Sequence, residues 1–193
     1  MTEQKLTFVP LTPERWNDFE TLFGPRGACG GCWCMYWRLP SRVFSENSGD
    51  ANRFAIKQLV LDGAEPGILA YDGERAVGWC AVAPRADYTR LERSRVLKAV
   101  DDQPVWAISC FFVARSHRRQ GLTLKLVEAA VAFAADHGAE IVEGYPIHYE
   151  SDQVPAPWAY TGFESTFLSA GFVEAARRSP RRPILRRVIK KAL

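Results

Sequence analysis

The residues with the clearest chemical signature lie between Val113 and Thr123, where an apolar stretch gives way to Arg118-Arg119-Gln120-Gly121. A helix that begins at Leu122 leaves its first backbone N–H groups without partners and carries partial positive charge at that end. Such a helix end binds anions. Glycine at position 121 lets the backbone approach a phosphate closely, and the two arginines add positive charge. The segment therefore predicts a turn that binds a pyrophosphate.

Two other phosphate-binding motifs are missing from the chain. Neither the Gly-x-Gly-x-x-Gly pattern of dinucleotide-binding domains nor the Gly-x4-Gly-Lys-Ser/Thr pattern of P-loop proteins occurs. Taken alone, the basic turn is also compatible with an ordinary strand-to-helix connection that carries solvated arginines. The surrounding elements decide between these interpretations.

The pattern of apolar residues predicts the elements that position this turn. The apolar run from 105 to 113 suits a central strand that is buried on both faces. The following segment, from Leu122 to His137, has helical spacing and ends at Gly138. Further elements are expected as strands at 5–9, 67–71, 76–83 and 141–145, a helix from Thr12-Pro13 to Phe23, a helix at 50–62, a short helix opened by a capping box at Thr161 to Glu164, and two final strands.

Composition and element order together predict the fold class. Hydrophobic residues make up 47% of the 193-residue chain and charged residues 24%, which is typical of a globular protein. The length suits a single domain over residues 1–193. Strands come first as a meander, with a hairpin turn at Asp72-Gly73, and then alternate with helices. We expect an α/β (α+β) fold with a mixed, mostly antiparallel central sheet flanked by helices.

In this context the basic turn resembles the acyl-CoA-binding motif of the GNAT N-acetyltransferase superfamily, Arg/Gln-x-x-Gly-x-Gly/Ala. Arg118 to Thr123 fits that pattern with one departure, because Thr123 stands where the family usually has glycine or alanine. The resemblance spans nearly the whole chain in element order. It implies acetyl-CoA as the co-substrate, bound by the backbone of Phe111, Phe112 and Val113 along the pantetheine arm. It also implies that the pyrophosphate is held by Arg118, Arg119, Gln120, Gly121, Leu122 and Thr123.

Acyl transfer to an amine requires a group that deprotonates the amine, a donor that stabilises the oxyanion and an acid for the thiolate. The tyrosine that often serves as the acid in this family is replaced by Phe167. Strand alternation places Glu143 and Tyr145 on one face, and we expect Glu143 to act as the base and Tyr145 to act as the acid or to orient the amine. A structural hydrogen bond or a solvent-facing pair is the alternative. Tyr160 is a further candidate for the acid.

We expect the segment from 24 to 48, which is rich in glycine, cysteine and aromatic residues, to be irregular. Since this region usually lines the acceptor pocket in the superfamily, we expect Trp33, Tyr36 and Trp37 to form an aromatic wall, closed by Trp158; core packing is the alternative. Three of the five cysteines, Cys29, Cys32 and Cys34, also lie here. They fall one short of the four ligands of a structural zinc site, and we expect no metal.

The leading functional hypothesis is an N-acetyltransferase that transfers an acetyl group from acetyl-CoA to a primary amine, with a small-molecule acceptor favoured over a peptide amine. The alternative from another class is a CoA-binding regulatory domain without turnover, which the phenylalanine at 167 would explain. The acceptor's identity stays open, as does the oligomeric state, although pairing of the C-terminal strands suggests a homodimer.

Charge is distributed unevenly along the chain. Eight of the 25 basic residues lie between Arg177 and Lys191, which leaves 17 against 22 acidic residues elsewhere. We interpret the basic end as a final strand with solvated arginines and expect no nucleic-acid partner. No apolar run reaches the roughly 20 residues of a membrane span, and the start lacks the layout of a signal peptide. We therefore expect a cytoplasmic protein without membrane contact.

Overall fold

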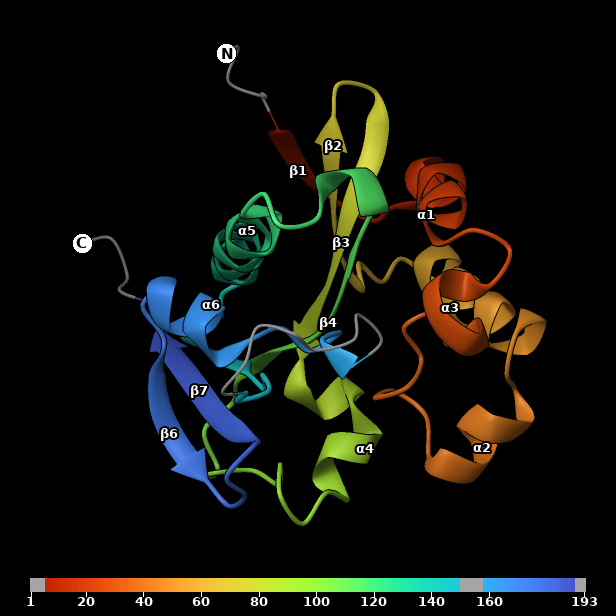
Figure 1. Ribbon diagram of the computed structural model, residues 1–193. Helices are drawn as coiled ribbons and strands as arrows, with labels where there is room; N and C mark the ends of the chain where they lie inside the picture. Colours follow the sequence, from red (N-terminus) through yellow and green to blue (C-terminus); the bar gives the residue numbers. More distant parts are fainter. Residues whose placement is uncertain (1–5, 150–157, 190–193) are drawn as a thin grey trace.

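The computed structural model describes residues 6–149 and 158–189 and contains a seven-stranded sheet in the order β1-β2-β3-β4-β5-β7-β6 (Figure 1). All pairs are antiparallel except β4 with β5. The predicted fold class is thus confirmed. The strands are β1 (Leu6–Pro10), β2 (Gly67–Asp72), β3 (Arg75–Pro84), β4 (Trp106–Val113), β5 (Ile141–Gly144), β6 (Val173–Arg177) and β7 (Pro183–Val188).

Helices cover both faces of the sheet (Figure 1). On one face, α5 (Leu122–Asp136) packs against β2, β3 and β4, and α6 (Glu164–Ser169) lies beside it. On the other face, α1 (Trp16–Phe23) packs against β3. The same side carries α2 (Ser41–Glu46), α3 (Asp50–Leu61) and α4 (Thr89–Glu92). Short turns of 3-10 or π type complete the described chain at η1 (Pro13–Arg15), η2 (Gly27–Gly31), η3 (Arg85–Asp87) and η4 (Arg115–His117).

The feature of the sheet that matters most is an opening between β4 and β5. The two strands pair in parallel only from Trp106 to Ile108, after which β4 continues to Val113 without β5 beside it. A β-bulge adjoins this point, because Ile108 pairs with Val82 and Cys110 with Ala81, which leaves Ser109 as the extra residue. A bulge bends a strand and increases its twist. The bulge therefore coincides with the separation of β4 from β5.

Two sequence predictions about local structure are wrong. Helix α6 begins after Phe163, whose backbone is extended, and no side chain caps it. The buried hydroxyl of Thr161 has no hydrogen-bond partner among the described residues, so the predicted capping box does not form. The segment from 24 to 48 is also more ordered than expected, since it includes α2. The start of that helix follows Pro40, which suits a first helical turn.

Phe167 is fully buried in the core between the sheet and α5. Its ring occupies the space where a Cβ on Gly144 would lie. We predict that Gly144→Ala lowers the free energy of unfolding by about 1–3 kcal/mol, because the methyl group overpacks this site. Urea unfolding measures this loss.

Gly78→Ala provides the matched control, because it is also a strand glycine with ordinary backbone angles. A Cβ there would meet only flexible leucine ends and one alanine methyl at 3.2 Å. Its cost should be smaller than that of Gly144→Ala. Equal costs for the two variants would contradict the proposed packing of Phe167.

Candidate active site

A cavity of about 1200 Å³ lies where β4 separates from β5. Because β4 runs parallel to β5, and β5 runs antiparallel to β7, the ends of β4 and β5 and the start of β7 meet at this edge. The cavity is lined by the 28–37 loop, β4, the segments on either side of 150–157 and the residues that precede β7. Its described lining residues are Ala28, Cys29, Gly30, Cys32, Cys34, Tyr36, Trp37, Phe44, Cys110, Phe111, Phe112, Arg118, Ile147, His148, Tyr149, Trp158, Tyr160, Arg181 and Arg182.

The basic turn follows β4 directly and opens α5, as the sequence predicts. Gly121 has a φ of 75°, which favours glycine, and a Cβ built there meets nothing within 4 Å. The N–H groups of the first helical turn, at Leu122 and Thr123, find no acceptor within the helix. Neighbouring contacts fix the turn: the Gln120 amide donates to the Ser116 carbonyl at 2.8 Å. The turn therefore presents an open backbone cradle with positive charge.

Some of the predicted cofactor-binding residues line the cavity, and others lie on the exposed surface that continues from it. Phe111, Phe112 and Arg118 line the cavity, and the Arg118 guanidinium donates to the Val113 carbonyl at 3.0 Å. The turn from Arg119 to Gly121 continues along the exposed surface, whereas the Leu122 side chain is buried. The Phe111 N–H, however, donates to the Tyr160 carbonyl at 2.6 Å. The next N–H group that faces this open edge of β4 therefore belongs to Val113, two residues further on.

Three of the four predicted aromatic wall residues line the cavity. Tyr36 and Trp37 pack edge to face with ring centroids 4.9 Å apart, and Trp158 is 71% exposed at the rim. Trp33 is the exception: it is 3% exposed and stacks on Phe23 in the core under α1. For Trp33 the core-packing alternative holds, and it is not part of the wall.

Tyr160, the further candidate for the acid, lies beside the part of β4 that β5 does not cover. Its backbone is bound to β4 and its side chain lines the cavity. Burial raises the pKa of its phenol well above the ordinary value of 10.0, and the neighbouring Tyr36 adds to the shift. The phenol is therefore protonated at neutral pH and can donate a proton.

Glu143 and Tyr145, by contrast, do not line the cavity. They do share one strand face, as expected, but the phenol donates to the carboxylate at 2.5 Å and both side chains are 1% exposed. The Arg186 guanidinium donates to Glu143 at 2.6 Å, and Arg85 donates to the Tyr145 hydroxyl at 3.0 Å. A carboxylate that is buried and bound by these partners cannot reach an amine in the cavity to take its proton. The structure thus favours the structural alternative over the predicted base and acid.

We predict that Glu143→Gln mainly reduces stability. It removes the buried partner of Arg186, and breaking a buried ion pair costs about 3 kcal/mol or more. Arg186 keeps its second partner, Asp101, at 2.6 Å, so the loss should lie at the lower end of this range. Chemical unfolding measures this cost. Turnover of the folded variant, measured well below its melting temperature, should stay within about threefold of wild type. A loss of turnover with stability unchanged would restore the catalytic assignment.

Four of the five cysteines line the cavity: Cys29, Cys32, Cys34 and Cys110. The Cys34 and Cys110 sulfurs are 3.3 Å apart, and the Trp79 indole N–H donates to Cys34 at 3.0 Å. Burial raises the pKa of Cys32 to about 11 and that of Cys34 well above its usual range, which disfavours the thiolates that zinc requires. Within the described part of the chain, no three side chains are arranged to hold a metal ion.

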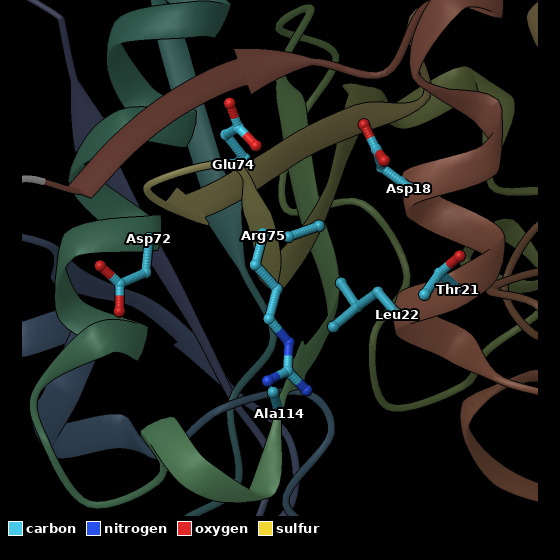
Figure 2. A pocket seen from close by; sticks show the side chains of 8 residues that line it. Asp18, Thr21, Leu22, Asp72, Glu74, Arg75 and Ala114 are labelled. Carbon is cyan, nitrogen blue, oxygen red and sulfur yellow. The ribbon is translucent and has the colours of Figure 1, made fainter.

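A second hollow of about 430 Å³ lies between α1 and the β2–β3 hairpin (Figure 2). Figure 2 shows the Arg75 side chain extending toward Ala114, away from the carboxylates of Asp18 on α1 and of Glu74 in the hairpin turn. Asp18 already accepts a hydrogen bond from the Tyr71 hydroxyl at 2.7 Å. This hollow contains neither the anion-binding turn nor the open strand edge, so it is not the candidate active site.

The comparisons with known proteins agree with this geometry. Residues 33–150 match the model of the Acetyltransferase (GNAT) family, which is more than half of the chain. This chain belongs to the GNAT acetyltransferase family. A search of curated proteins gave no match. None of the described helices is long and apolar enough to cross a membrane.

Solved GNAT structures share the fold at low sequence identity. A GNAT-family acetyltransferase from Listeria monocytogenes is 10% identical, with 95% of each chain covered and a TM-score of 0.59. Arylalkylamine N-acetyltransferase 2 from Aedes aegypti is 14% identical, with 96% of this chain and 100% of that chain covered and a TM-score of 0.56. The PaiA N-acetyltransferase from Thermoplasma acidophilum, in complex with coenzyme A, is 9% identical, with 96% and 99% covered and a TM-score of 0.53.

GNAT membership supports acetyl-CoA as the co-substrate, and the residues present fit it. The open backbone at Gly121 and the exposed Arg118 and Arg119 suit a pyrophosphate. The opening beyond Ile108 gives a narrow arm access to the edge of β4. Arg181 and Arg182 also line the cavity but were not predicted from the sequence, where the basic end was interpreted as solvated. The only available signal was their position immediately before an apolar strand.

Proposed function

We propose that this GNAT protein is an N-acetyltransferase that transfers an acetyl group from acetyl-CoA to the primary amine of a small molecule. The observation that carries the proposal is the single cavity that joins the anion-binding turn, the open edge of β4 and an aromatic wall. The turn suits the co-substrate and the wall suits an acceptor. Because the co-substrate and the acceptor bind in one cavity, the amine attacks acetyl-CoA directly in a ternary complex.

When bound, acetyl-CoA supplies the thioester carbon that the acceptor amine attacks. The Arg118 side chain and the first turn of α5 hold negative charge at the outer end of the cavity. The Val113 N–H is available to donate a hydrogen bond to a carbonyl group of the bound arm. Tyr160 keeps its proton at neutral pH and donates it to the thiolate as the C–S bond breaks, and the proton that the acylated nitrogen loses then restores the phenol.

A small acceptor is favoured by the enclosure of the acceptor region. Trp37 is 8% exposed and Tyr160 is partly buried, so this end of the cavity is walled by rings. Aromatic rings offer an apolar surface with fixed geometry, which suits a compact ligand. The name of the arylalkylamine N-acetyltransferase among the structural relatives is consistent with such an acceptor.

The test is a CoA-release assay with acetyl-CoA and a panel of amines, run beside calorimetric binding of acetyl-CoA. The panel contains phenethylamine, tryptamine, spermidine and a lysine-containing peptide. Turnover of a small amine supports the proposal, and turnover of the peptide alone contradicts the small-molecule assignment. Binding of acetyl-CoA without turnover of any amine would indicate a regulatory CoA-binding domain. Absence of acetyl-CoA binding to the folded protein would overturn the proposal altogether.

A further inference from the structure

The acceptor end of the cavity has an unbalanced charge. Three arginines line the cavity, namely Arg118, Arg181 and Arg182, and no aspartate or glutamate from residues 6–149 or 158–189 lines it. Arg118 belongs to the anion-binding turn, whereas the other two immediately precede β7. A cavity that receives a simple cationic amine would be expected to present an acid to it. This one presents guanidinium groups.

Arg182 has no ion-pair partner among the described residues, whereas Arg177 and Arg186 on the flanking strands do. Arg177 pairs with Glu164 and Glu174, and Arg186 pairs with Glu143 and Asp101. The Arg182 guanidinium donates only to the Tyr145 carbonyl, at 3.1 Å, and its Nε is buried without a hydrogen-bond partner in the described chain. A partly buried charge without a counter-charge is costly. An incoming anion would offset that cost.

Trp37 supplies a second donor beside this charge. It is 8% exposed, it lines the cavity, and its indole N–H has no hydrogen-bond partner among the described residues. The Arg182 guanidinium carbon lies 6.0 Å from the centre of the Trp37 ring. Buried donors are nearly always satisfied in native proteins, so unsatisfied donors on these two neighbouring side chains point to a ligand that accepts from them.

The surrounding walls indicate what accompanies the anion. The acceptor end contains the rings of Tyr36, Phe44, Trp158 and Tyr160. Tyr36 and Tyr160 meet edge to face at 6.0 Å, and Arg90 stacks over the outer face of Tyr36 at 4.0 Å. Such a set of rings favours an aromatic side chain on the ligand, which can pack edge to face or offset against them.

Resting on the proposed function, we propose that the acceptor is an aromatic α-amino acid, whose carboxylate binds Arg182 and the Trp37 indole N–H. A carboxylate can accept two parallel hydrogen bonds from the fork of a guanidinium. The α-amine, one carbon away, then lies in a field of positive charge. Nearby cations lower the pKa of an ammonium group and so favour the neutral amine that attacks the thioester. The arginines accept no proton, but they lessen the need for a general base because more of the amine is neutral before the attack.

Matched acceptor pairs test this assignment, because each pair differs only in the carboxylate. The pairs are tryptophan with tryptamine, phenylalanine with phenethylamine, and tyrosine with tyramine. For wild type we expect kcat/KM to be at least about 30-fold higher for the amino acid of each pair, which is the range of one charge-assisted contact. O-phosphoethanolamine serves as the phosphate-bearing comparison and should be a poor acceptor.

Arg182→Gln should remove most of this preference, lowering kcat/KM for tryptophan by about 30-fold or more and for tryptamine far less. Arg182→Lys keeps the charge without the fork and should restore part of the loss. Arg178→Gln is the matched control, since Arg178 lies on the same β6–β7 connection but donates to the Lys98 and Ala99 carbonyls outside the cavity. It should keep the wild-type preference. Thermal unfolding checks that all three variants are folded.

Calorimetric binding of tryptophan, with CoA present, gives a readout that does not depend on turnover. Wild type and Arg178→Gln should bind it, and Arg182→Gln should bind at least about 30-fold more weakly. A wild type that acetylates tryptamine better than tryptophan, or an Arg182→Gln effect equal for both members of a pair, would overturn the amino acid while leaving the proposed function standing. Failure to bind acetyl-CoA would instead remove the proposed function itself. A strong preference for O-phosphoethanolamine would also overturn the carboxylate assignment.

Discussion

Gly121→Glu should weaken the binding of acetyl-CoA by at least about 100-fold. The position has a φ of 75°, so any side chain is strained there, and the carboxylate would stand at the positive end of α5. Two like charges 4 Å apart repel by about 4 kcal/mol near a protein surface, more than the 2.7 kcal/mol that 100-fold requires. Isothermal titration calorimetry with acetyl-CoA measures the change in Kd.

The same helix provides the control. Gly138 follows α5 with a φ of 80°, and a Cβ there also meets nothing within 4 Å. Gly138→Glu therefore introduces the same side chain at the same kind of backbone, but far from the turn. It should lose comparable stability and still bind acetyl-CoA within about twofold of wild type. Gly121→Ala separates strain from charge and should weaken binding less than the glutamate. Equal binding by the Gly121→Glu and Gly138→Glu variants would show that the turn does not hold the phosphates.

The sequence predicted those elements best whose signals are local. The start of α5 after Gly121 and the extent of β4 agree with the prediction within one residue at each end. An apolar run and flanking glycines determine them, and these can be seen without knowing the rest of the fold. The basic turn was located for the same reason. It consists of consecutive residues between a strand and a helix.

The 28–37 loop could not be predicted in the same way. Ala28, Trp33 and Cys34 have positive φ angles, which cost energy for such residues and arise only where packing enforces them. Trp33 points into the core against Phe23, whereas Tyr36 and Trp37 face the cavity. The sequence showed three aromatic residues close together. Only the tertiary packing shows that Trp33 belongs to the core and that the other two belong to the cavity wall.

The catalytic assignment failed because its partners are distant in sequence. Glu143 and Tyr145 share a strand face as predicted, but Arg186 and Arg85 reach them from 43 and 60 residues away. Strand pairing of β5 with β7 brings Arg186 opposite Glu143. The same pairing brings Arg182 to the cavity edge. Long-range pairing therefore both removed the predicted base and supplied the missed arginine.

Tyr160→Phe should lower kcat by at least about 100-fold and leave KM for acetyl-CoA nearly unchanged. General acid catalysis contributes about 100- to 10,000-fold, and Tyr160 is the phenol that both lines the cavity and is bound to β4. The backbone hydrogen bond from Phe111 to Tyr160 does not need the hydroxyl, so the local structure should survive the substitution. Steady-state kinetics with a small amine measures both constants.

The pH profile and a neighbouring tyrosine make this test specific. Since burial raises the pKa of Tyr160 above 10.0, the acid form persists as pH rises, and wild-type kcat should show no decline from this group between about pH 7 and pH 10. Tyr36→Phe removes a hydroxyl from the same wall and should change kcat by less than about fivefold, because its ring still packs against Trp37. A Tyr160→Phe variant that keeps kcat within threefold of wild type would exclude Tyr160 as the acid. The thiolate would then leave unprotonated, a route open to so weak a base.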